Sequence, residues 1–332
     1  MTRKPRQLVI GHRGASGYRP EHSRAAYDLA FDLGADAVEP DIVATRDGVL
    51  VLRHENEISG TTDVAHRPEF STRKATKTID GVSLTGWFTE DFTWEELSTL
   101  RVVERLPQVR QTSTTFDGAQ GILRLRDLIE IIDAASVRVG RPLVMVAEIK
   151  HATYFESIGL ALDELFAAEV ADWATEDNLV IESFEQTVLL KIRARGVPGR
   201  LVFLVEKGGS PADLVALHGR KAQSYASHLT DFGLARLAAT VDGVSVDRRI
   251  IVDPDTAAVS DIVERAHAAG LIVFTWTLRP ENRFLTKAFR RGGGAAAWGD
   301  WRAEYGLILS TGLDGVFADQ PDLAVAVRDH GA

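Results

Sequence analysis

Residues 11–54 bring together side chains whose types suit acid–base and phosphate chemistry. His12 and His54 have ordinary pKa values of about 6.5, so one can act as an acid and the other as a base near neutral pH. Arg13 offers the planar fork of donors that fits a phosphate group. Glycines 11, 14 and 17 would let the backbone approach a ligand closely. This composition is typical of an active site.

Acidic residues two apart in the chain point to a metal site. Glu39 and Asp41 would share one face of a strand, and Pro40 between them places them at the end of that strand. Glu148 and Lys150 repeat the spacing. If these two strands end side by side, their three carboxylates would repel one another unless a cation lies among them. A solvated acidic pair and a simple Glu148–Lys150 ion pair are the alternatives, but the two nearby histidines favour a site for one divalent metal ion.

Composition limits the partners that are expected. The chain has 332 residues, a net charge of −9 and no cysteine. The negative charge argues against nucleic acid as a partner, and the absence of thiols leaves hard, oxygen-preferring metal ions. No apolar run is long enough for a signal peptide or a membrane span. We expect a small-molecule substrate and, for the chain as given, a cytoplasmic protein, or a secreted or periplasmic one if a leader was trimmed; the oligomeric state is open.

The pattern of apolar runs predicts the elements that must position these residues. Eight strands are expected to begin near residues 8, 37, 143, 178, 201, 243, 271 and 315, and most alternate with helical patterns. Eight such units predict an α/β TIM (β/α)8 barrel, a single domain over residues 1–332. Helices are expected over residues 23–34, 125–135, 154–170, 185–195, 256–269 and 322–328.

Two departures from a plain barrel follow the second strand. The short turn at residues 45–48 predicts an antiparallel hairpin that returns His54 to the neighbourhood of Asp41. Residues 55–121 are too long for a barrel loop and are expected to form an inserted cap. The main apolar anchors of this cap are aromatic: Trp87, Phe88, Phe92 and Trp94.

Candidate residues are expected where strands end, because the active site of such a barrel lies there. His12, Asp41, Lys150 and Phe184 meet this test. Trp276 shares a strand face with Phe274 and is either core packing or a pocket wall. The remaining candidates have structural alternatives: Glu182 lines the pocket or enters a helix, His22 supports the loop, and Asp319, just before Gln320-Pro321, is expected to be a helix N-cap.

The order and spacing of these motifs resemble the glycerophosphodiester phosphodiesterase family. The resemblance covers almost the whole chain, and the long cap is closest to the longer bacterial, periplasmic-type subgroup. The motifs that carry it are His12-Arg13-Gly14-Ala15-Ser16-Gly17-Tyr18, Pro20-Glu21-His22, Glu39-x-Asp41, Thr45-x-Asp47-Gly48, His54, Glu148-Ile149-Lys150, Glu182-Ser183-Phe184, Phe274-Thr275-Trp276-Thr277 and Gly315-Val316-Phe317-Ala318-Asp319.

The resemblance implies metal-dependent hydrolysis of glycerophosphodiesters to glycerol 3-phosphate and an alcohol. It also implies roles for single residues. His12 and His54 match the two catalytic histidines; Glu39, Asp41 and Glu148 match the ligands of one Ca2+ or Mg2+ ion; Arg13 and Lys150 match phosphate-binding positions; Trp276 matches a wall for the glycerol moiety, and Phe184 lies with it at the pocket. Glu55, Arg19 and Ser23 depart from the usual aspartate, apolar residue and threonine.

Other functions fit parts of the pattern. A phospholipase D-like hydrolase or lyase acting on a lysolipid, as in the related sphingomyelinase D enzymes, would need an apolar ledge, which the cap aromatics could supply. A non-catalytic ligand-binding barrel is disfavoured because both histidines and all three carboxylates occur together. A glycosidase uses paired carboxylates but does not call for the histidines and the arginine.

Overall fold

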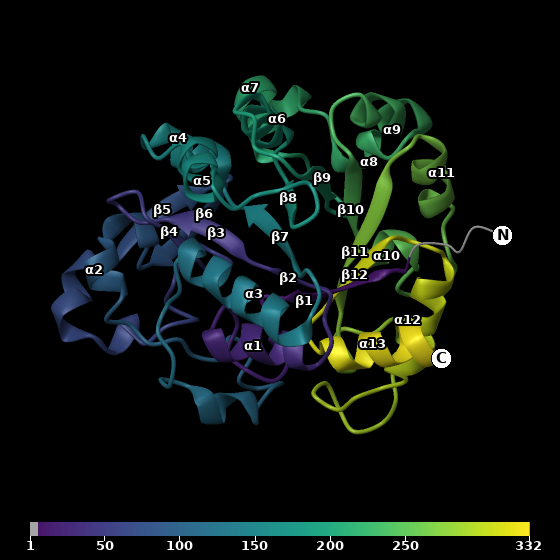
Figure 1. Ribbon diagram of the computed structural model, residues 1–332, viewed down its shortest axis with the longest axis horizontal. Coiled ribbons are helices and arrows are strands. Elements are labelled where there is room, and N and C mark those ends of the chain that lie inside the picture. The colour runs from purple at the N-terminus through teal and green to yellow at the C-terminus, as the bar shows by residue number, and fades with distance from the viewer. Residues whose placement is uncertain (1–5, 332) are drawn as a thin grey trace.

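Eight apolar segments form parallel strands that close into a barrel in the computed structural model, which describes residues 6–331 (Figure 1). Neighbouring strands follow the order β2-β1-β12-β11-β10-β9-β8-β7, and pairing between β2 and β7 completes the ring. The predicted TIM barrel and all eight predicted strand positions are therefore confirmed. The strands are β1 (Leu8–His12), β2 (Ala37–Glu39), β7 (Val144–Ile149), β8 (Leu179–Ser183), β9 (Arg200–Val205), β10 (Gly243–Asp247), β11 (Ile272–Leu278) and β12 (Gly315–Ala318).

Both faces of the barrel strands are buried, as parallel strands covered by helices require. The inside of the barrel is filled by a small apolar cluster that includes Ile10, Phe274 and Phe317. A much larger cluster lies between the strands and the surrounding helices. The barrel is thus a packed core, and only its carboxyl-terminal mouth is free to hold a site.

The helices depart from the sequence prediction in three places. The segment expected to form one helix over residues 154–170 forms two helices, because the chain turns at Gly159 (φ 82°). The helix expected over 256–269 begins later, because Val252 pairs with Val259 in the preceding loop. Outside segment 55–121, five helices were not predicted, over residues 212–218, 225–228, 231–238, 248–251 and 301–310. The helices are α1 (Arg24–Asp32), α2 (Trp94–Leu97), α3 (Leu125–Val139), α4 (Ala152–Ser157), α5 (Leu162–Val170), α6 (Gln186–Ala194), α7 (Ala212–His218), α8 (Tyr225–His228), α9 (Asp231–Ala238), α10 (Arg248–Ile251), α11 (Ile262–Ala268), α12 (Trp301–Ser310) and α13 (Pro321–His330), with 3-10 turns η5 (Gly219–Lys221) and η6 (Lys287–Phe289). Among residues 6–331, no helix is both long and apolar enough to cross a membrane.

The glycine-rich loop after β1 is fixed by close packing against α1. A Cβ on Gly14 (φ 83°) would lie 2.5 Å from the carbonyl carbon of Ala26 in that helix. A Cβ on Gly17 would lie 2.2 Å from the side chain of Gln320. The prediction that glycine serves close approach to a ligand is therefore wrong at these two positions, since the neighbours are parts of the protein itself.

Pro40 divides the second strand and redirects the chain. Before it, β2 pairs with β1, with His12 opposite Glu39. After it, β3 (Asp41–Ala44) pairs with β7, with Asp41 opposite Glu148, and with the antiparallel β4 (Leu50–Leu52). The predicted hairpin is confirmed, and it returns the chain to the barrel mouth just before His54.

Residues 55–121 contain ordered structure that was not predicted. A two-stranded hairpin of β5 (Ala75–Ile79) and β6 (Val82–Gly86) turns at Asp80. The segment also holds α2 and the 3-10 turns η1 (Val64–His66), η2 (Pro68–Arg73), η3 (Thr89–Asp91) and η4 (Ser113–Phe116). Trp87, Phe88 and Phe92 are buried inside it and Trp94 is half-buried. None of the four lines the cavity at the barrel mouth, so the lysolipid alternative, which would need them as an apolar ledge, is not favoured.

Candidate active site

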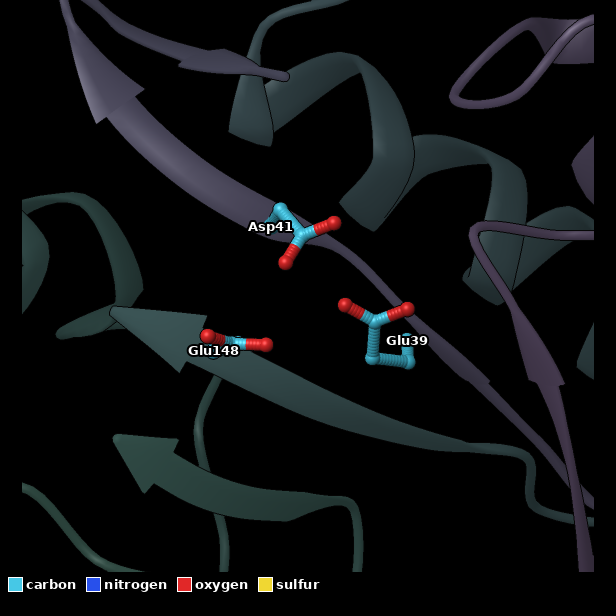
Figure 2. A group of neighbouring side chains, drawn as sticks. All are labelled: Glu39, Asp41 and Glu148. Carbon is cyan, nitrogen blue, oxygen red and sulfur yellow. The ribbon is translucent and has the colours of Figure 1, made fainter. Parts of the chain in front are cut away.

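Three carboxylates from three strand ends converge at the barrel mouth. Figure 2 shows Glu39, Asp41 and Glu148 pointing toward one another, and each offers an oxygen within 4.8 Å of the others. All three are buried. Within the described chain, Glu39 Oε1 and Asp41 Oδ1 have no hydrogen-bond donor. Buried carboxylate oxygens without partners are costly, and hard oxygens of this kind are the ligands that Ca2+ and Mg2+ prefer, so these residues fit a divalent cation.

The electrostatics of the cluster agree with this fit. Burial, together with the negative charge of Asp41, raises the pKa of Glu39 well above its usual range. Burial likewise raises the pKa of Glu148 to about 8, even though Lys150 Nζ lies 2.9 Å from its Oε1 atom. Burial also opposes ionisation of Asp41, but Arg13 and the other nearby donors together outweigh it and hold the pKa of Asp41 well below its usual range. Despite Arg13 and Lys150, burial and mutual repulsion thus still raise the pKa of two of the three carboxyls, which a bound cation would relieve.

His12 is held by the carboxylate of Asp319, which the sequence pattern predicts to be a helix N-cap. Its Nδ1 atom lies 2.6 Å from Asp319 Oδ1, and the other oxygen of Asp319 accepts hydrogen bonds from Arg110 and from Arg279 Nε, the latter at 2.6 Å. The N-cap position of α13 is Gln320, without a side-chain cap. The N-cap assignment of Asp319 is therefore wrong: this carboxylate orients His12 and leaves Nε2 as the free ring nitrogen.

His54 is held in a similar way from the opposite side. Its Nδ1 atom lies 2.9 Å from Glu55 Oε1, and Glu55 Oε2 lies 3.1 Å from His151 Nε2. His151 in turn contacts Asp80, at the tip of the β5–β6 hairpin, through Nδ1 at 2.6 Å. The contact joins the hairpin of segment 55–121 to the barrel next to Lys150.

Both histidines are neutral in this arrangement. Burial lowers the pKa of His12 to about 3, and the positive charge of Arg13 adds to the effect. The pKa of His54 is also lowered to about 3, mainly by burial and further by the positive charges of Arg13 and Lys150. A neutral imidazole whose Nδ1 proton is directed to a carboxylate presents an unprotonated Nε2, which is the form that a general base requires.

Arg13 and Lys150 lie where a phosphate could meet them. Arg13 has a left-handed backbone (φ 60°), its N–H donates to Glu39 Oε2 at 2.8 Å, and its guanidinium contacts Glu21 and Asp41. Lys150 Nζ contacts Glu148. Both side chains are buried and line the same cavity as the histidines. All predicted polar site residues are thus brought together.

The predicted aromatic residues also border this cavity, which has a volume of about 840 Å³. Phe184 and Trp276 line it, and their rings meet edge to face with centroids 5.7 Å apart. Phe274 packs inside the barrel below Trp276. Cap aromatics do not contribute: among the residues that line the cavity, segment 55–121 supplies Glu55, Thr78, Asp80, Gly81, Arg105 and Leu106.

Two further polar residues support the cluster. His22 Nε2 lies 2.9 Å from Asp41 Oδ2, so His22 orients a carboxylate of the cluster as well as supporting its loop. Glu182 is 1% exposed, stands opposite Glu148 in β8 and lines the cavity, which confirms the pocket alternative for this residue. Its position at a strand end is the signal that sequence reasoning used for the other site residues.

Comparisons with known proteins agree with the fold and the site. The sequence profile of the Glycerophosphoryl diester phosphodiesterase family matches residues 12–323. A glycerophosphodiester phosphodiesterase of Arabidopsis thaliana (GDPD6) is 31% identical, over 96% of this chain and 86% of the relative. The Haemophilus influenzae glycerophosphodiester phosphodiesterase is 25% identical, over 97% of this chain and 90% of its own.

A solved structure with a similar fold contains a ligand. It is an Oleispira antarctica phosphodiesterase in complex with the product sn-glycerol-3-phosphate, with a TM-score of 0.63, 19% identity and coverage of 98% of this chain and 97% of that one. The membership of a periplasmic-type subgroup stays a prediction. The profile match and the plant relative show that the chain belongs to the glycerophosphoryl diester phosphodiesterase family of enzymes.

Proposed function

We propose that the protein hydrolyses glycerophosphodiesters, the deacylated forms of phospholipids, to sn-glycerol 3-phosphate and a free alcohol, with one Ca2+ or Mg2+ ion as cofactor. The observation that carries the proposal is the placement of two imidazoles, each held through Nδ1 by a carboxylate, beside three buried carboxylates. The names of the curated relatives and the product bound to the Oleispira antarctica enzyme support the substrate class.

The charged residues at the mouth divide into two groups. Glu39, Asp41 and Glu148 would hold the cation, which when bound neutralises charge on the phosphoryl oxygens. Arg13 and Lys150 bind the same phosphate from the protein side. Because the guanidinium and the ammonium are already fixed by buried carboxylates, they need little reorganisation as negative charge grows in the transition state.

The two histidines transfer the protons. In each, Nδ1 faces a carboxylate, so Nε2 is the atom that works. One imidazole removes the proton of the nucleophile, which is water or the glycerol hydroxyl next to the phosphate, as its oxygen bonds to phosphorus. The other donates a proton to the oxygen of the departing alcohol as that P–O bond breaks. Attack by the glycerol hydroxyl gives a cyclic phosphodiester, which water then opens. An anionic phosphodiester beside a neutral imidazole favours its protonated form, so substrate binding prepares the acid.

We further infer that residues 55–121 act as an inserted cap on a single barrel domain, residues 1–332. Thr78, Asp80, Arg105 and Leu106 of this segment border the cavity. Ion pairs join the segment to the mouth, among them Arg105 Nε with Glu21 at 2.7 Å and Arg110 with Asp319. The cap would exclude water from the reacting phosphate.

A coupled assay for sn-glycerol 3-phosphate tests the proposed function. The purified protein with Ca2+ or Mg2+ should release glycerol 3-phosphate from glycerophosphocholine, glycerophosphoethanolamine, glycerophosphoglycerol or glycerophosphoinositol. A lysophospholipid in a parallel reaction should not be cleaved, since the cap aromatics offer no surface for an acyl chain. Cleavage of the lysolipid alone would overturn the assignment.

A further inference from the structure

The cavity at the barrel mouth extends beyond the reacting centre. Next to the histidines its lining carries both signs of charge, since Arg13, Lys150 and Arg279 lie there with the carboxyl groups of the metal-site cluster. The extension lies past Phe184, where Glu185 and Glu206 line the wall. These two acids follow β8 and β9, so they belong to the same carboxyl-terminal rim as the reacting centre.

The acids of the extension have no cationic side chain in direct contact within the described chain. Glu185 is buried, and its carboxylate accepts hydrogen bonds from the backbone and hydroxyl of Thr153, which are neutral donors. Neither Glu185 nor Glu206 forms an ion pair with any residue in the range 6–331. Burial raises the pKa of Glu185 to about 7 and raises the pKa of Glu206. Both carboxylates would gain from a positive charge in the cavity.

Aromatic rings form the wall between the two parts. Phe184 meets Trp276 at 5.7 Å and 86°, and it meets Tyr225 of α8 at 6.2 Å and 80°. Phe184 therefore meets both neighbouring rings edge to face, and the face of an aromatic ring attracts an ammonium group. Leu204 and Val215 complete the lining with apolar surface, which suits the methyl groups of a quaternary ammonium.

An independent polar group is directed into the same cavity. Glu182 Oε2 has no hydrogen-bond donor in the described chain, although the residue is 1% exposed. Glu182 stands two residues before Phe184 at the end of β8, so both side chains lie on one side of that strand end. The cavity therefore holds a carboxyl oxygen without a hydrogen-bond partner beside Phe184, in addition to the two acids that follow it.

We propose that the extension past Phe184 binds the leaving alcohol and selects one that carries an ammonium group, such as choline or ethanolamine. This inference rests on the proposed function. A zwitterionic diester has a negative phosphate, which Arg13 and Lys150 could bind, and a positive head group, which the acids Glu185 and Glu206 could bind. A polyol head group would place hydroxyl groups against ring faces and leave the carboxylates without a counter-charge.

The test uses the full-length enzyme with Ca2+ and two diesters of equal shape. One is glycerophosphocholine; in the other, the 3,3-dimethylbutyl ester, carbon replaces the nitrogen and the charge is lost. The measured quantity is the ratio of kcat/KM for the charged ester to kcat/KM for the neutral one. The ammonium also makes choline a better leaving group, and this effect belongs to the substrate. The change of the ratio from the wild type to a variant therefore measures how much the substituted residue contributes to ammonium binding.

Glu206→Gln and Phe184→Leu should each lower the ratio at least about threefold, since each removes one attraction to the ammonium and keeps the size or the apolar character of the side chain. Glu176→Gln is the matched control. Glu176 is exposed in the loop before β8, at the end of the strand opposite the cavity. The kcat/KM ratio of this variant should equal that of the wild type. An unchanged ratio in both cavity variants would overturn the inference.

The outcome also separates this inference from the proposed function. Hydrolysis of glycerophosphoglycerol together with an unchanged ratio in the variants would leave the phosphodiesterase intact and remove only the ammonium site. If none of the three diesters is hydrolysed, both the ammonium site and the proposed function are overturned.

Discussion

Replacing Asp319 with asparagine should separate the orientation of His12 from the stability of the mouth. In the protein, Asp319 Oδ1 lies 2.6 Å from His12 Nδ1, so the carboxylate accepts the Nδ1 proton and leaves Nε2 free. An asparagine amide can donate to Nδ1 instead, which moves the ring proton to Nε2 and removes the base. Proton transfer by a positioned group contributes about 10²- to 10⁴-fold to rate, so kcat should fall by that factor with KM little changed.

The same substitution removes a charge that faces Arg110 and Arg279. Breaking a buried ion pair costs about 3–5 kcal/mol, so the free energy of unfolding should fall by up to that amount. The control is Glu281→Gln, because Glu281 contacts Arg110 at 2.9 Å, is equally buried and is not among the hydrogen-bond partners of His12.

Steady-state kinetics below the unfolding temperature and urea unfolding give the two quantities for both variants. Glu281→Gln should lose stability and keep kcat within about threefold, whereas Asp319→Asn should lose both. Equal loss of kcat in the two variants, or a fully active Asp319→Asn enzyme, would refute the role of Asp319 in orienting His12.

Other predictions follow from the same site. His12→Ala and His54→Ala should each abolish turnover while near-ultraviolet circular dichroism stays native; an active single variant would contradict the acid–base pair. Chelation should inactivate the enzyme, and Ca2+ at 100 times its Kd should restore activity and stabilise the fold by about 2.7 kcal/mol, seen in thermal unfolding. Because the pKa of Glu148 is raised to about 8, metal binding at pH 7 should release protons, and calorimetric heats that do not vary with buffer ionisation enthalpy would oppose this. Burial lowers the pKa of His12 to about 3, whereas in the unfolded chain it is about 6.5. As the pH falls below about 6.5, the unfolded state takes up a proton that the folded state does not, and the free energy of unfolding decreases. From pH 7 to pH 5 the wild type should therefore lose about 1–2 kcal/mol more than His12→Ala in urea unfolding.

The barrel could be predicted because its strands are short apolar runs buried on both faces, which is a strong local signal. The rule that barrel sites lie at the carboxyl ends of strands then located His12, Asp41 and Lys150. Helices such as α7 (Ala212–His218) and α8 (Tyr225–His228) were missed, because they are too short for apolar periodicity to stand out.

The groups that orient the histidines could not be predicted from local patterns. Asp319 precedes a proline and looks like an N-cap, and only the pairing of β1 with β12, Gly11 opposite Ala318, brings it to His12. Arg110 reaches Asp319 from within residues 55–121, where no periodic signal exists. Long-range contacts of this kind are set by barrel closure and by the path of the inserted segment, neither of which leaves a mark on neighbouring residues.

A crystal structure of the protein with Ca2+ and sn-glycerol 3-phosphate tests the central claim most directly. The proposed function predicts that the ion contacts Glu39, Asp41 and Glu148 and that the phosphate lies between His12 and His54, in contact with Arg13 and Lys150. An ion bound away from the three carboxylates, or a phosphate outside the reach of both imidazoles, would contradict it.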